Sequence, residues 1–161
     1  MSGVANAVLG GWQVSGITGL KDGFPLAFYA ANNAFAFNAA QRPNVTGDPT
    51  SGSCPNGSTV GTLNCWFNTT AFTQPAAFTF GNAPRTMPNL RGAEINNWDL
   101  AIQKWWHVQE KLRIQFRTEF FNAFNRTYLF TPDAFLGSPN FGRISEAGPQ
   151  RSIQLGLKVY W

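Results

Sequence analysis

The stretch RSIQLGLKVYW, residues 151 to 161, decides the fold of this chain. Successive side chains of a β-strand point to opposite faces, so this stretch has two different faces. One face is apolar and carries Ile153, Leu155, Leu157, Val159 and Trp161. A bilayer is crossed by about 9 to 11 residues of tilted strand, with lipid-facing and lumen-facing positions in alternation. The stretch therefore predicts a membrane-spanning strand with an aromatic residue at its end.

A second alternating stretch lies upstream, at residues 111 to 124. Apolar side chains alternate there with a polar set, which consists of Arg113, Gln115, Arg117 and Glu119. A basic side chain on the lipid side costs about 2 to 4 kcal/mol at the bilayer centre, so we expect these residues to face the lumen of a barrel. We expect Asp99 to face the lumen too, from a strand over residues 97 to 107, and Trp105 and Trp106 to lie at the membrane interface.

The order of strands and turns predicts an all-β fold. We expect an antiparallel up-and-down meander, a partial transmembrane β-barrel of about five strands with two long loops. Asp22-Gly23 favours a tight hairpin turn, and a second short turn falls at residues 108 to 110. We place both turns on the periplasmic side and both long loops outside the cell. The expected strands lie near 10–20, 24–30, 97–107, 111–124 and 151–161, and the long loops at 31–96 and 125–150.

Composition agrees with a membrane barrel better than with an ordinary soluble domain. Charged residues make up 12% of the chain, against about 25% in a typical soluble domain. The sequence contains no run of about 18 apolar residues, which excludes a membrane-spanning helix. The net charge of +4 comes from scattered Lys and Arg residues, and without a basic cluster it does not predict nucleic-acid binding.

The residues that carry catalytic or metal chemistry are few. His107 is the single histidine, so neither a hydrolytic triad nor a zinc site with Cys54 and Cys65 is complete. We expect no enzymatic activity and no cofactor. The two cysteines lie in one polar loop, where a disulfide in an oxidising compartment is the preferred interpretation and two free thiols are the alternative.

Several motifs in a fixed order resemble the barrel carboxyl terminus of TonB-dependent receptors, in particular the Oar-like group. They cover nearly the whole chain: GGWQVSGI (10–17), DGFP (22–25), RPN (42–44), WFNTTAF (66–72), FGNAPR (80–85), LRG (90–92), NWDLAI (97–102), RIQFRTEFFNAFN (113–125) and GSPNFGRI (137–144). The terminal alternating strand with its final aromatic also resembles outer-membrane barrels of Gram-negative bacteria.

This resemblance implies a location and a set of partners. The location is the cell outer membrane, and the function is energised uptake of a scarce ligand that the sequence does not identify. The implied partners are outer-membrane lipid, the TonB system, and the barrel-assembly machinery, which reads the terminal strand. The first residues lack a secretory signal. We therefore expect the chain to be part of a longer receptor, with a plug domain and earlier strands as further partners.

A second hypothesis is a secreted β-rich binding domain that recognises carbohydrate or protein through loop aromatics. The aromatic residues concerned are Trp66, Phe67, Phe72, Phe78 and Phe80. They could equally pack the long loop on itself. The amphipathic terminal strand favours the membrane barrel, because a soluble binding domain has no need of it.

Overall fold

The computed structural model describes residues 3–34 and 39–161, and strands dominate the described part. It divides into two compact units, which we describe separately. The sheet unit comprises Met1–Lys21, Asn96–Tyr128 and Pro149–Trp161, and the loop unit comprises Asp22–Ile95 and Leu129–Gly148. Among the described residues, no helix has the length and apolar character needed to cross a membrane.

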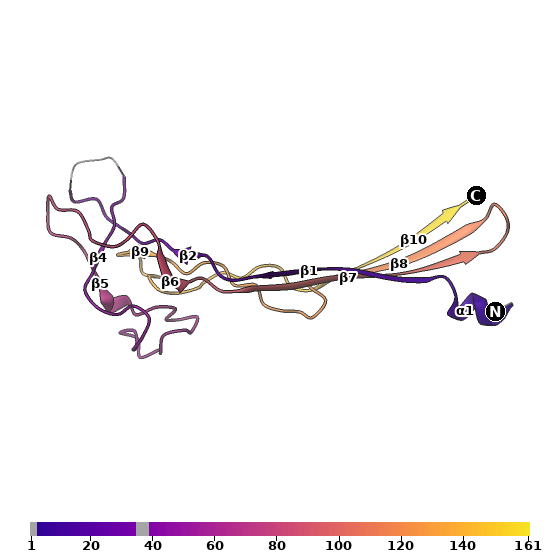
Figure 1. Ribbon diagram of the computed structural model, residues 1–161, viewed down its shortest axis with the longest axis horizontal. Helices are drawn as coiled ribbons and strands as arrows, with labels where there is room; N and C mark the ends of the chain where they lie inside the picture. The colour runs from indigo at the N-terminus through magenta and orange to yellow at the C-terminus, as the bar shows by residue number, and fades with distance from the viewer. Residues whose placement is uncertain (1–2, 35–38) are drawn as a thin grey trace. The chain divides into compact units, whose positions relative to one another are not determined.

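Four long strands form the sheet unit. They are β1 (Trp12–Lys21), β7 (Ile95–His107), β8 (Arg113–Phe121) and β10 (Ser152–Tyr160), in the order β1-β7-β8-β10 (Figure 1). β7 pairs antiparallel with β8, and β8 with β10. β1 also runs antiparallel to β7, because Trp105 N–H donates to the Gly11 carbonyl at 2.8 Å while Gly16 approaches Leu100. The arrangement is an open up-and-down meander.

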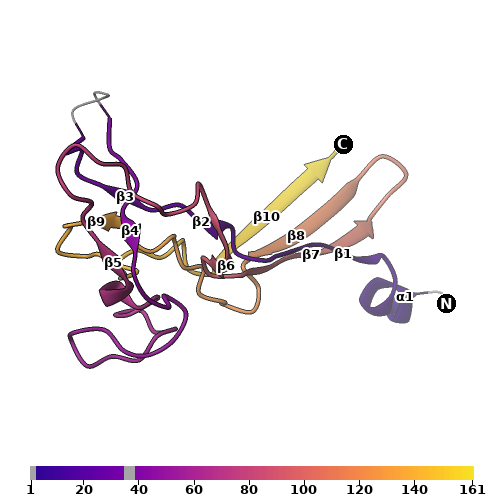
Figure 2. The same cartoon turned by 60° about the vertical axis from the view of Figure 1, so that its left-hand side comes forward.

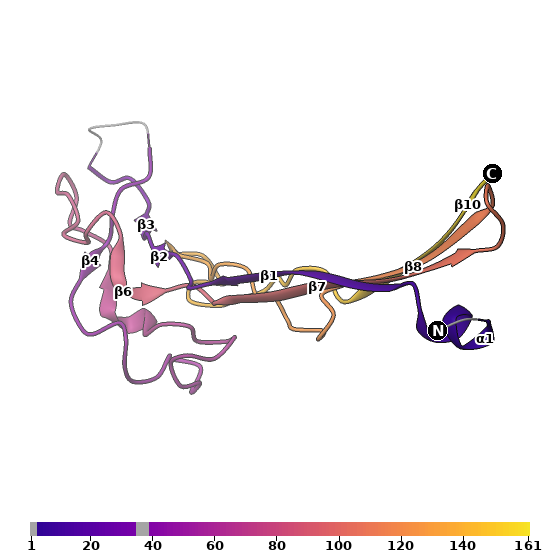
Figure 3. The same ribbon diagram turned by 45° about the vertical axis from the view of Figure 1, so that its right-hand side comes forward.

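The connections of this sheet alternate in length. β7 and β8 are joined by a short turn, in which Val108 N–H donates to the Leu112 carbonyl at 2.9 Å. The long connections from β1 to β7 and from β8 to β10 both leave from the opposite end of the sheet. The short helix α1 (Val4–Leu9), the carboxyl terminus and the β7–β8 turn lie together at one end (Figure 3).

The predicted hairpin at Asp22-Gly23 is wrong. β1 pairs with β7, and residues 24–30 do not join the main sheet. Gly23 instead lies so close to Gly92 that an added Cβ would be 1.8 Å from the Gly92 carbonyl oxygen. The Phe24 carbonyl accepts a hydrogen bond from Gly92 N–H at 2.9 Å. The chain therefore continues away from β1 and does not fold back beside it. Residue 21 therefore lies at the opposite end of the sheet from the 108–110 turn, and the two turns do not share one side.

The segments predicted as the long loops 31–96 and 125–150 contain regular structure. In place of one strand at 24–30, β2 (Pro25–Leu26) pairs with β6 (Met87–Arg91), and β3 (Tyr29–Ala30) pairs in parallel with β9 (Phe135–Leu136). β4 (Asn44–Val45) pairs with β5 (Phe72–Thr73), beside the 3-10 helix η1 (Thr69–Ala71) (Figure 2). The main sheet thus has four strands, where the sequence predicted about five in one meander.

The loop unit has an aromatic core of its own. Phe28 stacks on Phe72 with ring centroids 4.3 Å apart, and Phe67 meets Phe28 edge to face at 4.9 Å. Phe141 closes the group against Phe67 at 5.1 Å. Such aromatic pairs add to the free energy gained by burying the rings. The sequence did not predict this core for two reasons. The segments are polar in composition, and their aromatic residues lie far apart in the chain.

Candidate functional site

The strand register divides the side chains of the sheet unit into two faces. Residues that lie directly opposite each other in paired strands share a face, so Leu155 shares its face with Thr118 and with Ile102. We call the apolar side the outer face. It carries Trp12, Val14, Thr18, Leu20, Trp98, Leu100, Ile102, Lys104, Trp106, Ile114, Phe116, Thr118, Phe120, Ile153, Leu155, Leu157 and Val159. Apart from Lys104, this face is uncharged.

The carboxyl-terminal strand is exposed along its whole length within the chain. Ile153, Leu155, Leu157 and Val159 all belong to the outer face and expose about half of their area or more. Trp161 follows the end of β10 and is almost fully exposed. Exposed apolar surface of this extent marks a face that meets another apolar phase or a partner.

The opposite side, which we call the inner face, is polar. Asp99, Arg113, Gln115, Arg117 and Glu119, the predicted lumen residues, all lie on it. Arg117 and Glu119 form an ion pair at 2.6 Å, and Asp99 accepts a hydrogen bond from Asn122 N–H at 2.9 Å. The charged groups of this face are therefore at least partly satisfied within the sheet.

Hydrogen bonds link side chains across all four strands of the inner face. Tyr160 Oη donates to Gln115 Oε1 at 3.4 Å, and Gln115 Nε2 donates to Gln103 Oε1 at 2.8 Å. Gln103 Nε2 in turn donates to Gln13 Oε1 on β1. We call these four residues the glutamine ladder. Sequence reasoning missed it, because the alternation places each glutamine on the inner face without showing which ones are neighbours.

Trp105 and Trp106, the predicted interfacial aromatics, lie next to each other at the end of β7. Trp105 and Trp106 continue the alternation of β7 and point to opposite faces. Trp105 lies on the inner face with its ring centroid 5.6 Å from that of Tyr160, and Arg113 lies over the same Tyr160 ring at 5.7 Å. Trp106 alone lies on the outer face, where its indole N–H donates to the Ala7 carbonyl at 3.1 Å.

A disulfide joins Cys54 and Cys65 in the loop unit. The disulfide closes a ring of the chain between the two cysteines. Isolated β-bridges between Ser53 and Thr59 and between Thr62 and Cys65 stabilise this ring. Both cysteines are buried, as is Phe67 two residues further on. The ring therefore supports the aromatic core.

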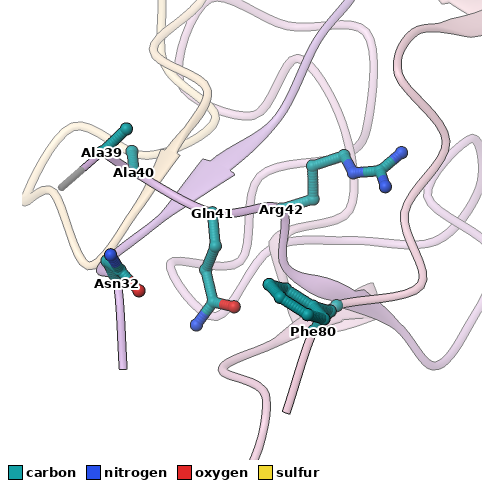
Figure 4. A pocket seen from close by; sticks show the side chains of 7 residues that line it. Asn32, Ala39, Ala40, Gln41, Arg42 and Phe80 are labelled. Carbon is teal, nitrogen blue, oxygen red and sulfur yellow. The ribbon is translucent and has the colours of Figure 1, made fainter. Parts of the chain in front are cut away.

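A hollow of about 270 Å³ opens on the loop unit (Figure 4). Gln41, Arg42 and Phe80 line it, and in Figure 4 the side chain of Arg42 extends in a different direction from the amide of Gln41. Phe80 is 64% exposed, and among the described residues the buried Oε1 atom of Gln41 has no hydrogen-bond partner. An aromatic ring and an amide lining one hollow suit a polar ligand with a flat face. The remaining lining residues are Asn32, Ala39, Ala40 and Gly81.

Of the titratable groups in the loop unit, Asp48 has a clearly shifted pKa. Hydrogen bonds from Ser51 Oγ and then from the hydroxyl and N–H of Thr50 lower the pKa of Asp48 to about 2. These bonds favour the ionised carboxylate and hold a local turn. In the described ranges, no group of three or more His, Cys, Asp or Glu residues is arranged to hold a metal ion.

Comparison with known proteins adds one result. A family model described as "Outer membrane beta barrel domain" matches residues 1–154. This range includes β1, β7, β8 and the start of β10, together with the whole loop unit. No curated protein and no solved structure matches the chain.

Proposed function

The chain belongs to the outer membrane β-barrel domain family, and from this premise we propose that it forms part of a TonB-dependent receptor for energised uptake of a scarce ligand. The outer face lies against the lipid of the outer membrane, and the inner face lines the lumen. In this proposal the order of the motifs, from GGWQVSGI at residues 10–17 to the terminal strand, indicates an Oar-like receptor.

The observation that carries the proposal is the charged inner face. The inner face carries more basic than acidic residues, so its net charge is positive. The basic residues are Lys21, Arg113, Arg117 and Lys158, and the acidic ones are Asp99 and Glu119. A lumen with this many charges needs water or a polar plug domain to solvate them. A receptor supplies both, because its plug fills the barrel and must be released for transport.

The open edges of the sheet add a requirement. β1 and β10 each pair on one side only within the described sheet. Unpaired backbone groups at a strand edge are not tolerated in hydrocarbon, so further strands must close the barrel. In our proposal these strands come from the preceding part of the same receptor, together with the plug.

The loop unit is proposed as the external ligand-contacting part. Both long connections leave the sheet from the end opposite the β7–β8 turn, and in the family long connections are the external ones. The hollow beside Phe80 favours carbohydrate or another polar ligand with a flat face. An outer-membrane protein is not a secreted domain, so this binding role is a second function within the receptor.

Binding to TonB tests the proposal. The full-length protein, purified in detergent from outer membranes, is mixed with the periplasmic domain of TonB from the same bacterium. We expect a complex that survives size-exclusion chromatography, and none with a general porin as the control. Absence of the complex, together with uptake that is insensitive to collapse of the proton gradient, would leave an outer-membrane protein without TonB-dependent transport.

A further inference from the structure

Helix α1 is attached to the outer face of the sheet by side-chain donors. Trp12 Nε1 donates to the Val8 carbonyl at 2.9 Å, and Trp106 Nε1 donates to the Ala7 carbonyl at 3.1 Å. The last carbonyls of a helix have no partner within the helix and must be satisfied from outside. Here two indole groups of the outer face supply those partners.

Lys104 completes this attachment. Its ammonium group donates to the carbonyl of Gly10 and lies 3.4 Å from that of Val8. The same group lies over the rings of Trp12 and Trp106, at 5.3 and 5.6 Å from their centroids. We call Trp12, Lys104 and Trp106 the clamp.

The clamp explains a charge on the lipid side of a membrane strand. Lys104 is 1% exposed and is the single charged residue of the outer face. A helix carboxyl terminus attracts cations, and aromatic faces attract them as well. The carboxyl-terminal carbonyls of helix α1 therefore stabilise the buried ammonium group of Lys104, which in turn fixes the helix on the side of the sheet that meets lipid.

The helix exposes apolar side chains. Its sequence, VANAVL, has no charged side chain, and Val4 and Leu9 are 81% and 65% exposed. Trp12 of the outer face contacts the helix through its bond to Val8, and Trp12 and Val14 are themselves 54% and 69% exposed. Helix α1 lies at the end of the sheet that holds the β7–β8 turn and the carboxyl terminus, where a spanning strand emerges from the bilayer.

We propose that α1 is an interfacial helix that inserts its apolar surface into the headgroup region of the phospholipid leaflet and is held there by the clamp. Continuity with the lipid-facing outer face identifies the occupant as lipid. Tryptophan rings are enriched at this depth of a membrane, which fits Trp12 and Trp106. The inference rests on membership of the barrel family and does not depend on TonB.

Depth-dependent quenching tests the location of the helix. The full-length protein with Val4→Cys is labelled with the fluorophore NBD under non-reducing conditions and reconstituted into phosphatidylethanolamine–phosphatidylglycerol vesicles. The matched control is Glu110→Cys, in the polar turn at the same end of the sheet. We expect a blue-shifted probe at Val4 that is quenched by lipids with a nitroxide near the headgroup. The control probe should be quenched by aqueous iodide instead.

Two variants test the clamp. Loss of a hydrogen-bonded charge should lower the ratio of docked to undocked α1 by roughly tenfold in Lys104→Met, and lipid quenching of the Val4 probe should become weaker. Lys158→Met, on the inner face, is the matched control. Trp106→Phe removes the indole donor and decides the question if Lys104→Met does not fold.

Two results would overturn the inference. One is a probe at Val4 that behaves like the probe at Glu110, in water and without lipid quenching. The other is lipid quenching at Val4 that neither Lys104→Met nor Trp106→Phe changes. Cross-linking of Val4→Cys to a second copy, without lipid quenching, would assign the apolar surface to a protein contact and would also refute the proposal.

Discussion

Gln115 is the residue whose replacement tests the inner face most directly. It is 8% exposed, and its amide joins two neighbours of the glutamine ladder. Gln115→Leu keeps a similar volume but removes both hydrogen bonds. The change leaves Gln103 Oε1 without its donor at 2.8 Å and removes a longer bond of 3.4 Å from Tyr160.

The expected loss can be worked from these two bonds. A neutral hydrogen bond contributes about 1 kcal/mol net, and a buried acceptor left without a donor costs about 1 to 3 kcal/mol. The bond to Tyr160 is long, so it adds little. We therefore expect Gln115→Leu to lower the free energy of unfolding by about 1 to 2 kcal/mol.

Urea unfolding of the full-length protein in phospholipid vesicles, followed by tryptophan fluorescence, measures this loss. Gln154→Leu is the matched control, since Gln154 lies on the same face but is exposed, and its replacement should change the free energy by less than about 0.5 kcal/mol. The double variant with Gln103→Leu should be less destabilised than the sum of the single variants, because both remove one shared bond. Equal effects of Gln115→Leu and Gln154→Leu would refute the reasoning.

Three further predictions concern the terminal strand and the loop unit. Deletion of Trp161 should lower the surface level of the full-length protein, measured by whole-cell labelling, without changing its ligand affinity; a normal surface level would contradict this. Cys54→Ser with Cys65→Ser should cost about 2 to 4 kcal/mol of local stability, seen as faster hydrogen exchange around Phe67 but not in the sheet unit. The pKa of Asp48 falls from 3.8 to about 2 on folding, so its stabilisation is complete above pH 3.8 and is lost as the pH falls through about 2. The NMR chemical shifts of Thr50 and Ser51 should change with pH as Asp48 titrates, and this change should be absent in D48N.

The alternation of residues was enough to predict the strands of the main sheet and their faces. A period of two is a local property, so Arg113 and Arg117 fall on one side whatever the neighbours of the strand are. The observed strands β1, β7, β8 and β10 lie within a few residues of the ranges expected at 10–20, 97–107, 111–124 and 151–161. The outer membrane location follows from the same alternation together with the family match.

The loop unit shows where sequence reasoning stops. Asn, Gly, Pro and Ser dominate its segments, and this composition predicts long loops. The core forms because Phe28, Phe67, Phe72 and Phe141 come together from distant parts of the chain. Spacing along the chain does not record such contacts.

The sequence by itself therefore determined the four long strands of the main sheet, which face of each is apolar, and that the apolar faces suit a membrane. The tertiary structure decided that β1 lies beside β7, that the glutamines of the inner face form one ladder, and that α1 covers Lys104. The physical reason is the distance along the chain over which each interaction acts. Side-chain alternation depends on adjacent residues, whereas strand neighbours, ladders and helix docking depend on the free energy of contacts between segments far apart in the chain.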